Sequence, residues 1–368
     1  MFQLKSFVEK TNFVQTIDYL KKILLIRFSS IGDIVLTTPV IRTLKQQLHC
    51  ELHVLTKQQY ASITQSNPNV DLVYELKNNL KEIISELRSE QYDFVVDLQK
   101  NARSVRIRKA LRRPSASFPK LNREKWLMVN FKINRLPNVH VVDRYFEAVK
   151  AVNVKNDGEG LNFFIPEKDH VNPAKLQPWA RKGYAGFVIG GRHRTKMLPY
   201  EKIVAIINQL KMPVILLGGP EDKENGDFIT EATQNERVWN SCGRFNLNQS
   251  ASLIKQAKVI LTHDTGLMHI AAAFQKPIIS IWGNTIPGFG MYPYMPDNKG
   301  KSIIAEVTGL NCRPCSKLGY KKCPKKHFKC MNYQSVDFIA ESANRLYFSS
   351  IHKHRPARKQ RPEKKRSQ

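Results

Sequence analysis

Short apolar runs alternate with longer stretches that repeat an apolar residue every three or four positions, and this alternation fills most of the chain. Short runs bounded by polar or glycine residues indicate buried strands, whereas the 3.6-residue repeat indicates helices. Prolines interrupt a mixed pattern between residues 115 and 139, which indicates no clear element. The first half predicts strands over Ile23–Ile26, Glu51–Leu55, Leu72–Tyr74 and Phe94–Asp97, and helices over Ile34–Leu48, Leu80–Glu90 and Asp143–Val152.

The alternation restarts after residues 166–178, which have no clear periodicity and which we interpret as a linker. The strands of the second half end in glycine or a small polar residue, as loops that approach a ligand require. This half predicts strands over Ala185–Gly190, Val214–Leu217, Val259–Thr262 and Pro277–Trp282, and helices over Tyr200–Leu210 and Leu267–Ala273. Strands that alternate with helices are typical of a parallel sheet, so we predict an α/β fold with two successive Rossmann-like halves.

The domain boundaries follow from these patterns. We expect an N-terminal extension (1–20), a first Rossmann-like domain (21–170) and a second (171–335), which includes a cysteine-rich basic loop (311–330). An amphipathic helix (336–350) and a basic, disordered tail (351–368) follow. No stretch reaches the roughly 18 to 20 apolar residues of a membrane span, and the N-terminus is too polar for a secretory signal. The sequence therefore predicts a cytoplasmic protein.

The net charge of +28 is concentrated in three stretches, Lys100–Arg113, Asn311–Cys330 and Ile351–Gln368, which together carry 21 of the 28 charges. Such local surpluses indicate anionic partners, namely nucleic acid, anionic lipid or a phosphorylated substrate. Nucleic-acid surfaces usually interleave aromatic residues with the cations, and Lys100–Arg113 contains none. We therefore expect no nucleic acid, and we expect peripheral contact of the basic patches with the inner membrane surface.

A first candidate site lies between Lys21 and Gln47, where a strand turns through Ser29-Ser30-Ile31-Gly32-Asp33 into a helix. Open α/β sheets place their chemistry at such points, outside the carboxyl ends of the strands. Asp33 then lies beside a helix N-terminus, whose partial positive charge stabilises a carboxylate. Two interpretations stay open: Asp33 acts as a base, or it only caps the helix.

A second candidate site lies in Leu261–Thr285, where a strand ends in His-Asp-Thr-Gly and a helix starts at once. Asp264 or Thr265 can cap this helix, and its free N–H groups form an anion site. His269, three residues after Gly266, projects near the same helix mouth, and Asp264 can accept a hydrogen bond from a ribose hydroxyl. The alternative is an ordinary cap at Asp264 and a core position for His269.

Four of the six cysteines form the pattern C-x2-C-x7-C-x6-C. Four thiolates can close a tetrahedral structural zinc site, and His327 offers a substitute ligand. The alternative is that the thiols stay reduced and bind no metal. The four residues are Cys312, Cys315, Cys323 and Cys330.

The two turns together, Ser29–Ile34 and Asp264–His269, resemble the ADP-heptose:lipopolysaccharide heptosyltransferases, glycosyltransferase family 9. Their order, their separation and the Gly-Gly strand ends between them also match the family. The resemblance implies a GT-B fold, in which two Rossmann-like domains face each other across a cleft. It implies a metal-independent, inverting transfer of a heptose from an ADP-sugar to a lipopolysaccharide core or another surface glycan, with no cofactor required.

The resemblance also implies the roles of individual residues. Asp33 takes the place of the general base, which removes the proton from an acceptor hydroxyl. Lys196 matches a lysine that stabilises the charge of the leaving ADP. Glu221 matches an acid that contacts the nucleoside, although a first-turn helix acid is an equal alternative. The donor is held by Asp264, Thr265, Gly266 and His269.

An anionic glycolipid acceptor is implied on the side of the first domain. Asn101 and Arg103 match an Asn-x-Arg element of the family, and Arg106 extends the same basic stretch. Ser30 and Gly32 belong to the acceptor side of the first turn. Arginines in this position can grip phosphate or acid groups in a bidentate way. The alternative is a solvated basic helix face.

Other functions stay open beside this one. They are an NDP-sugar transferase that uses a different sugar, a nucleotide-sugar enzyme such as an epimerase and, least favoured, a basic nucleic-acid-binding protein. A dehydrogenase is not supported, because the first loop reads Ser-Ser-Ile-Gly-Asp rather than G-x-G-x-x-G.

Overall fold

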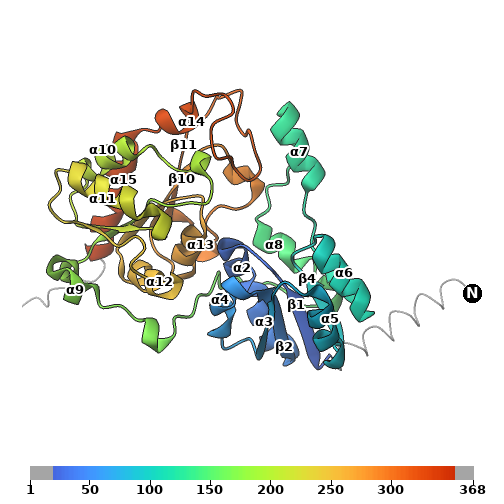
Figure 1. The fold of residues 1–368 in the computed structure, drawn as a ribbon. Coiled ribbons are helices and arrows are strands. Elements are labelled where there is room, and N and C mark those ends of the chain that lie inside the picture. The colour runs from blue at the N-terminus through green and yellow to red at the C-terminus, as the bar shows by residue number, and fades with distance from the viewer. Residues whose placement is uncertain (1–19, 353–368) are drawn as a thin grey trace, which may run out of the picture.

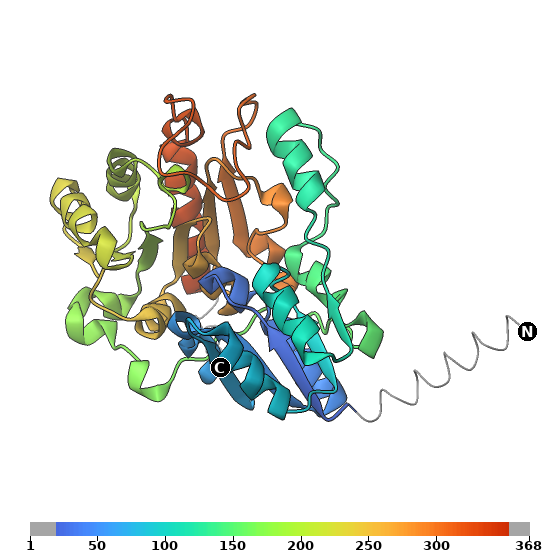
Figure 2. The ribbon, with the colours of Figure 1, turned by 45° about the vertical axis from the view of Figure 1, so that its right-hand side comes forward.

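The computed structural model describes residues 20–352, so the predicted N-terminal extension and most of the predicted basic tail lie outside the described residues. The chain forms two α/β lobes, which Figure 1 shows side by side and Figure 2 shows after a 45° turn. Within the described range, no helix combines the length and the apolar character needed to cross a bilayer.

The first lobe contains a five-stranded parallel sheet in the order β3-β2-β1-β4-β5. Three of the strands lie where the sequence predicts them, with ends shifted by up to two residues, and β4 matches its prediction at both ends. The sequence missed β5, which has only three residues. The strands are β1 (Lys22–Ile26), β2 (Glu51–Lys57), β3 (Leu72–Leu76), β4 (Phe94–Asp97) and β5 (Ser115–Ser117).

Helices cover both faces of this sheet. The helix predicted over 34–48 is two helices, because Pro39 has no N–H to donate and is tolerated only in the first turn of a helix. The helix predicted over 143–152 is α8 followed by a short 3-10 turn, Lys150–Val152. The helices are α2 (Ile31–Val35), α3 (Thr38–Leu48), α4 (Ser62–Gln65), α5 (Leu80–Ser89), α6 (Ala102–Leu111), α7 (Asn122–Phe131) and α8 (Val141–Phe146).

The second lobe contains a six-stranded parallel sheet in the order β11-β10-β9-β6-β7-β8. The sequence missed the two edge strands, β8 and β11, whose side chains are only partly buried and therefore lack a continuous apolar run. The strands are β6 (Ala185–Val188), β7 (Val214–Leu217), β8 (Val238–Asn240), β9 (Val259–His263), β10 (Ile278–Trp282) and β11 (Ser302–Glu306).

The helices of the second lobe again lie on both faces of its sheet. The short helix α9 (Pro173–Leu176) lies in the predicted linker, and α15 extends the predicted final helix by two residues. The others are α10 (Tyr200–Gln209), α11 (Lys223–Ala232), α12 (Leu247–Gln256), α13 (Gly266–Ala273), α14 (Lys329–Asn332) and α15 (Val336–His352).

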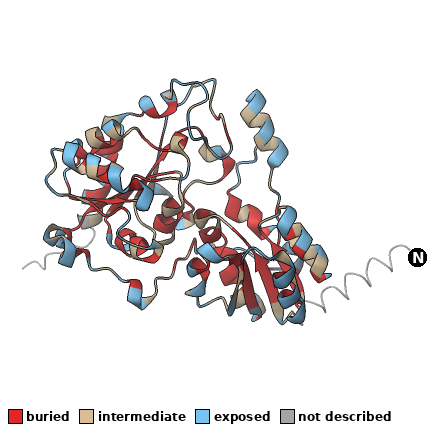
Figure 3. Ribbon diagram, viewed as in Figure 1, coloured by how far each residue is buried: buried red, intermediate tan, exposed pale blue. Residues whose placement is uncertain are grey.

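The buried core reaches from one lobe into the other. Successive side chains of a strand point to opposite faces, so Ile23 and Leu25 of β1 join one apolar cluster and Leu24 and Ile26 join another. The cluster that contains Ile23 also contains residues of β7, β9 and α13 in the second lobe. Figure 3 shows this buried material in red along both sheets. Of the three apolar clusters, one therefore contains residues from both lobes.

Candidate active site

A cavity of about 1130 Å³ lies where the two lobes meet, at the carboxyl ends of β1, β6, β7 and β9. Both turns singled out in the sequence line it, although more than 230 residues separate them. The predicted site residues that line it are Ser30, Gly32, Asp33, Lys196, Glu221, Asp264, Thr265, Gly266 and His269.

Asp33 lies in the first turn of α2, on the wall of this cavity. Its Oδ2 accepts hydrogen bonds from the backbone N–H of Ser30 at 3.0 Å and from the Ser30 hydroxyl at 2.9 Å. Its Oδ1 lies 2.6 Å from Nη2 of Arg27, a buried residue at the end of β1. The N-cap residue is Ser30, so the alternative that Asp33 is the N-cap is wrong by three positions. Asp33 is the third residue of the helix and accepts from the Ser30 N–H as the acid of a capping box.

The environment of Asp33 favours its charged form. Burial alone raises the pKa of this carboxyl, but the Arg27 cation and the two Ser30 hydrogen bonds outweigh burial and hold the pKa below its usual value. The carboxylate is therefore ionised at neutral pH. About a quarter of the side chain is exposed, so a hydroxyl group in the cavity can reach it.

The N-terminal turns of α2 and α13 pack directly against each other. A Cβ at Gly32 would lie 2.5 Å from Cδ2 of His269, and a Cβ at Gly266 would lie 2.8 Å from Cβ of Ile31. Real Cβ atoms essentially never approach so closely, so both positions require glycine for this contact. The two glycines therefore bring the first-lobe carboxylate and the second-lobe helix mouth to one cavity.

His269 is buried in this contact, as the alternative of a core position anticipated, and it also lines the cavity. Burial lowers its pKa to about 4, although Asp264 and Asp33 act in the opposite direction. The ring is therefore neutral at pH 7. Among the residues that the structure describes, its Nδ1 has no hydrogen-bond partner. A buried polar atom without a partner is costly and indicates a place for a ligand or a water molecule.

Lys196 and Asp264 form a close ion pair on the opposite wall. Lys196 lies in a 3-10 turn after β6, and its Nζ is 2.5 Å from Oδ2 of Asp264. The Thr285 hydroxyl donates to the same oxygen at 2.9 Å. The side chains of Lys196 and Asp264 are mostly buried, so each holds the other in place. By contrast, Arg194 donates to the carbonyls of Met197 and Leu198 and supports the turn from outside.

The first turn of α13 has unused hydrogen-bond donors. Thr265 occupies the N-cap position, but within residues 20–352 its side chain makes no capping hydrogen bond. Asp264 is engaged by Lys196 and Thr285 instead, and no acidic residue lies in the first turn. Thr265 is therefore the N-cap residue, as one of the two options expected, but neither its side chain nor that of Asp264 bonds to the first-turn N–H groups, which remain open to an anion.

Glu221 lies in a 3-10 turn, Pro220–Asp222, after β7 and is exposed at the cavity wall. Its neighbour Asp222 is buried and accepts a hydrogen bond from the backbone N–H of Gly219 at 2.9 Å. Burial raises the pKa of Asp222, with Glu221 acting in the same direction. Asp222 thus shapes the turn, and Glu221 is free to face a ligand.

The basic stretch on α6 lies outside the cavity. Asn101 is the N-cap of α6 and accepts a hydrogen bond from the backbone N–H of Ser104 at 3.0 Å. Arg103 and Arg106 are exposed and, like Asn101, are not among the cavity residues. Their role in acceptor binding stays a prediction.

Three other lysines line the cavity near Asp33, none of which the sequence assigned to the site. Lys120 precedes α7, Lys125 lies on α7, and Lys317 belongs to the cysteine-rich loop. Burial lowers the pKa of Lys125 to about 8, and the nearby Arg144 cation acts in the same direction. The charge runs were visible in the sequence, but the mixed pattern of residues 115–139 hid the helix that positions Lys125.

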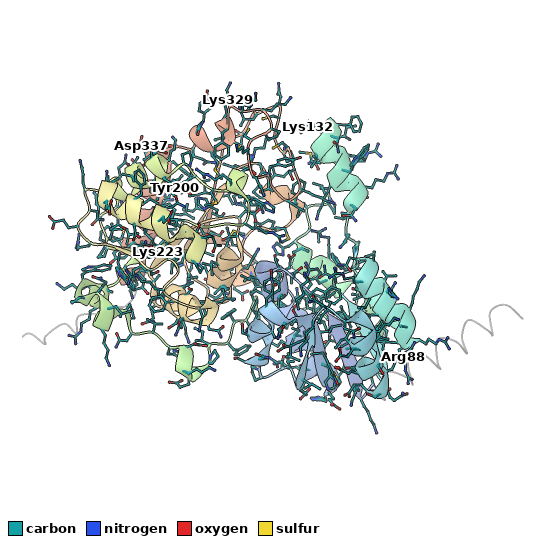
Figure 4. All side chains as sticks on the ribbon, in the orientation of Figure 1. Arg88, Lys132, Tyr200, Lys223, Lys329 and Asp337 are labelled. Carbon is teal, nitrogen blue, oxygen red and sulfur yellow. The ribbon has the colours of Figure 1, made fainter. Side chains whose placement is uncertain are left out.

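The cysteine-rich loop docks beside Lys196. The backbone N–H and the hydroxyl of Thr195 both donate to the carbonyl of Tyr320, at 3.2 and 3.1 Å, and the Tyr320 N–H donates back to that hydroxyl at 2.8 Å. This contact brings Lys317 and Leu318 to the cavity. On its outer side the loop meets α7, since Lys132 Nζ donates to the carbonyl of Pro314 at 2.7 Å. Figure 4 labels Lys132 at the end of α7 that faces this loop.

The four cysteines of this loop are free thiols. Cys312 Sγ lies 3.8 Å from Nε2 of His327, but in the described part of the chain no three such ligand atoms that include a cysteine lie within 4.8 Å of one another. A tetrahedral zinc site needs four ligands within about 2.3 Å of the metal, so the loop would have to rearrange before these side chains could hold one. Zinc binding stays a prediction.

One other group of potential metal ligands, Glu51, His53 and Glu90, lies in the first lobe. Lys22 Nζ already lies 2.8 Å from Glu90 and 3.3 Å from Glu51. The lysine cation therefore balances these carboxylates, and the group lies apart from the cavity residues.

Comparisons with known proteins agree with this geometry. The family "Glycosyltransferase family 9 (heptosyltransferase)" matches residues 80–323. Lipopolysaccharide heptosyltransferase 1 of Campylobacter coli is 26% identical over 289 residues, which cover 72% of this chain and 84% of that protein. Lipopolysaccharide heptosyltransferase 3 of Escherichia coli K12 is 24% identical over 285 residues, which cover 69% and 80%.

Solved structures show the same fold. The glycosyl transferase family 9 protein from Veillonella parvula superposes with a TM-score of 0.70 at 20% identity, covering 90% of this chain and 98% of that one. The ADP-heptose LPS heptosyltransferase II of E. coli gives a TM-score of 0.68 at 20% identity, covering 90% and 99%. These likenesses confirm the predicted GT-B arrangement of two α/β domains across a cleft.

Proposed function

The chain belongs to glycosyltransferase family 9, and on this premise we propose that it moves a heptose from ADP-heptose to a lipopolysaccharide core or another surface glycan. The observation that carries the proposal is the single cavity to which α2 brings an ionised carboxylate and α13 brings an uncapped N-terminus. A carboxylate and an anion site on facing lobes are what a displacement at a sugar diphosphate needs.

The proposed reaction is a direct displacement that inverts the anomeric carbon. The acceptor hydroxyl oxygen forms a bond to that carbon while the bond to the phosphate oxygen breaks, and ADP leaves with the electron pair. Asp33 accepts the hydroxyl proton. Arg27 and Ser30 fix the orientation of its carboxylate, because they hold its oxygens from the side of the protein.

The donor diphosphate is proposed to sit on the N–H groups of Thr265 and Gly266, where the helix dipole favours negative charge. Lys196 supplies the positive charge that stabilises the leaving ADP, and Asp264 positions it through the 2.5 Å ion pair. His269 is neutral and can offer a hydrogen bond without adding charge. Glu221 is proposed to contact the nucleoside from the other side of the cavity.

The acceptor is proposed to bind on the side of the first lobe. Lys120, Lys125 and Lys317 surround the approach to Asp33, and their charges suit phosphate or carboxylate groups on a glycolipid. All six cysteines lie in the described residues and are free, which supports a reducing compartment such as the cytoplasm. We propose that no metal takes part in the transfer.

Titration calorimetry with ADP, UDP and GDP, with and without EDTA, tests the donor assignment. We expect ADP to bind best and EDTA to change nothing. A preference for UDP would replace the sugar nucleotide but keep the transferase. Incubation with ADP-heptose and the acceptor should release ADP and form the inverted glycoside, which NMR identifies. Conversion of the nucleotide sugar without ADP release would favour an epimerase.

A further inference from the structure

The helix α7 projects from the first lobe beside the cavity. Among the α-helices within residues 20–352, it alone has no fully buried residue, although Lys125 is partly buried at the cavity wall. Figure 1 shows it standing clear of both sheets, and Figure 3 shows it without red. A ten-residue helix is marginal in water without tertiary packing. Packing against the core of this chain therefore does not account for the stability of α7.

Large apolar side chains are exposed on α7 and just after its last residue. Trp126, Phe131 and Ile133 are 55%, 59% and 47% exposed, and we call these three residues the α7 patch. The rings of Trp126 and Phe131 contact each other edge to face, with centroids 5.2 Å apart. Large apolar side chains that gather on a surface mark an interaction site.

The sequence on both sides of the α7 patch is strongly basic. Residues 98–142 contain twelve lysines and arginines and one acidic residue, Glu124. Arg123, Lys132 and Arg135 are exposed on α7 and the segment that follows it. Aromatic side chains flanked by cations are the composition of proteins that lie at the surface of an anionic bilayer. A nucleic acid would stack on the rings but would leave the aliphatic Ile133 exposed.

The position of α7 connects this surface to the chemistry. Its first turn lines the cavity through Asn122 and Lys125, and Phe131 lies about 9 Å beyond Lys125 along the helix at 1.5 Å per residue. A lipid-anchored acceptor presents its sugar at the bilayer surface, so the cavity must open next to that surface. The α7 patch lies on the side where such an acceptor would enter.

We propose that the α7 patch docks on an anionic lipid bilayer, with Trp126, Phe131 and Ile133 in the interface and the surrounding cations against lipid phosphates. The proposal rests on the proposed function only for the lipid anchor of the acceptor. It assigns membrane contact to the rim of the cavity, within the residues that the structure describes.

Flotation of the full chain with vesicles tests the proposal. We expect binding to vesicles of three parts phosphatidylethanolamine and one part phosphatidylglycerol, and little binding to phosphatidylcholine. Replacing Trp126→Ser together with Phe131→Ser should weaken binding by about tenfold, or ~1.4 kcal/mol. The matched control Phe228→Ser, at an exposed aromatic of α11, should bind as the wild type does.

Charge reversal tests the electrostatic part. Arg123→Glu with Arg135→Glu should weaken binding to the anionic vesicles, and the loss should shrink as salt screens the charges. The matched control reverses Arg181 and Lys182, two exposed cations of the second lobe, and should have a smaller effect. Equal losses in the two pairs would mean that net charge alone drives binding and would overturn the assigned surface.

Fluorescence separates docking from a structural role. Vesicles with brominated acyl chains should quench Trp126, and Trp126→Phe should remove that quenching while it preserves vesicle binding. Quenching that is the same in both proteins would overturn the proposal. So would a wild-type dimer in light scattering that the Trp126→Ser, Phe131→Ser variant converts to a monomer, because the α7 patch would then bind a second copy.

The assays also separate this proposal from the proposed function. The Trp126→Ser, Phe131→Ser variant should keep wild-type ADP affinity and transfer to a water-soluble acceptor, and lose transfer only to acceptor embedded in vesicles. Loss on both acceptors would count against docking. If the wild-type chain binds vesicles but not ADP, the proposed transferase function would be contradicted and the docking proposal would stand.

Discussion

The contact between α2 and α13 and the rim formed by α7 and the cysteine-rich loop face the same cavity but are built differently. At the contact, glycine backbone meets side chains of the other lobe so closely that no Cβ fits. At the rim, a helix without buried residues meets a loop through Lys132 and backbone carbonyls. The rigid contact positions the reacting groups, and the open rim leaves room for a large acceptor.

This difference assigns separate tasks to the two regions. Bond-making groups need a fixed geometry, because small displacements of a catalytic group are costly in rate. An acceptor that stays anchored in a membrane needs a surface and charge more than a closed pocket. Changes at the contact should therefore affect turnover and donor binding, and changes at the rim should affect the acceptor.

The largest effect is expected at Asp33. Replacing Asp33→Asn removes the base and should lower turnover by about 10²- to 10⁴-fold, the range for a general base. ADP affinity should change little, because the carboxylate faces the acceptor side. Ser30→Ala, which removes only the 2.9 Å hydroxyl contact, is the control and should lose much less activity. Equal losses of turnover and ADP affinity would make Asp33 structural.

A smaller effect is expected at Lys196. Lys196→Ala removes the cation beside the diphosphate and leaves Asp264 without its charged partner. A hydrogen bond to a charged group contributes roughly 1.5–3 kcal/mol, so ADP affinity should fall about 10- to 100-fold in calorimetry. Lys175→Ala, at an exposed lysine of α9, is the control. Unchanged ADP affinity would remove Lys196 from the donor site.

A substitution at Gly266 tests the contact between α2 and α13 itself. Gly266→Ala places a Cβ against Ile31 and should lower the free energy of unfolding by about 1–3 kcal/mol, as overpacking does. Chemical denaturation measures this change. Gly300→Ala is the matched control, since a Cβ there meets no atom within 4 Å. A variant as stable as the control would show that the two lobes move apart at little cost.

The smallest effect is expected at the rim. Because the pKa of Lys125 is lowered to about 8, this lysine loses its charge as the pH rises through 8. The KM for an anionic acceptor should therefore increase a few-fold between pH 7 and 9, while ADP affinity stays constant. Lys125→Arg keeps its charge in this range and should flatten the profile. A KM profile that is the same in both proteins would exclude Lys125 from acceptor binding.

The sequence predicted the rigid region well and the rim poorly. Buried strands such as β1 and β9 are continuous apolar runs, and the polar turns after them bring Asp33 and Asp264 to the sheet edges in a way that pattern alone can foresee. The ion pair between Lys196 and Asp264 and the glycine packing depend on how two lobes meet, and no local pattern reports that.

The rim could not be predicted because its elements lack the usual signals. The helix α7 has no buried face, so its sequence shows no amphipathic repeat. The sequence shows where basic residues are frequent but not where they lie in the fold. The clustered arginines of α6 led to the acceptor prediction, whereas the lysines that line the cavity are Lys120, Lys125 and Lys317.

Two contacts, Gly32 with His269 and Gly266 with Ile31, link the evolution of two distant parts of the chain. A mutation that enlarges one partner is tolerated only if the other, more than 230 residues away, becomes smaller. In descendants of this sequence, these two pairs should therefore change together or not at all, even where the surrounding loops diverge freely.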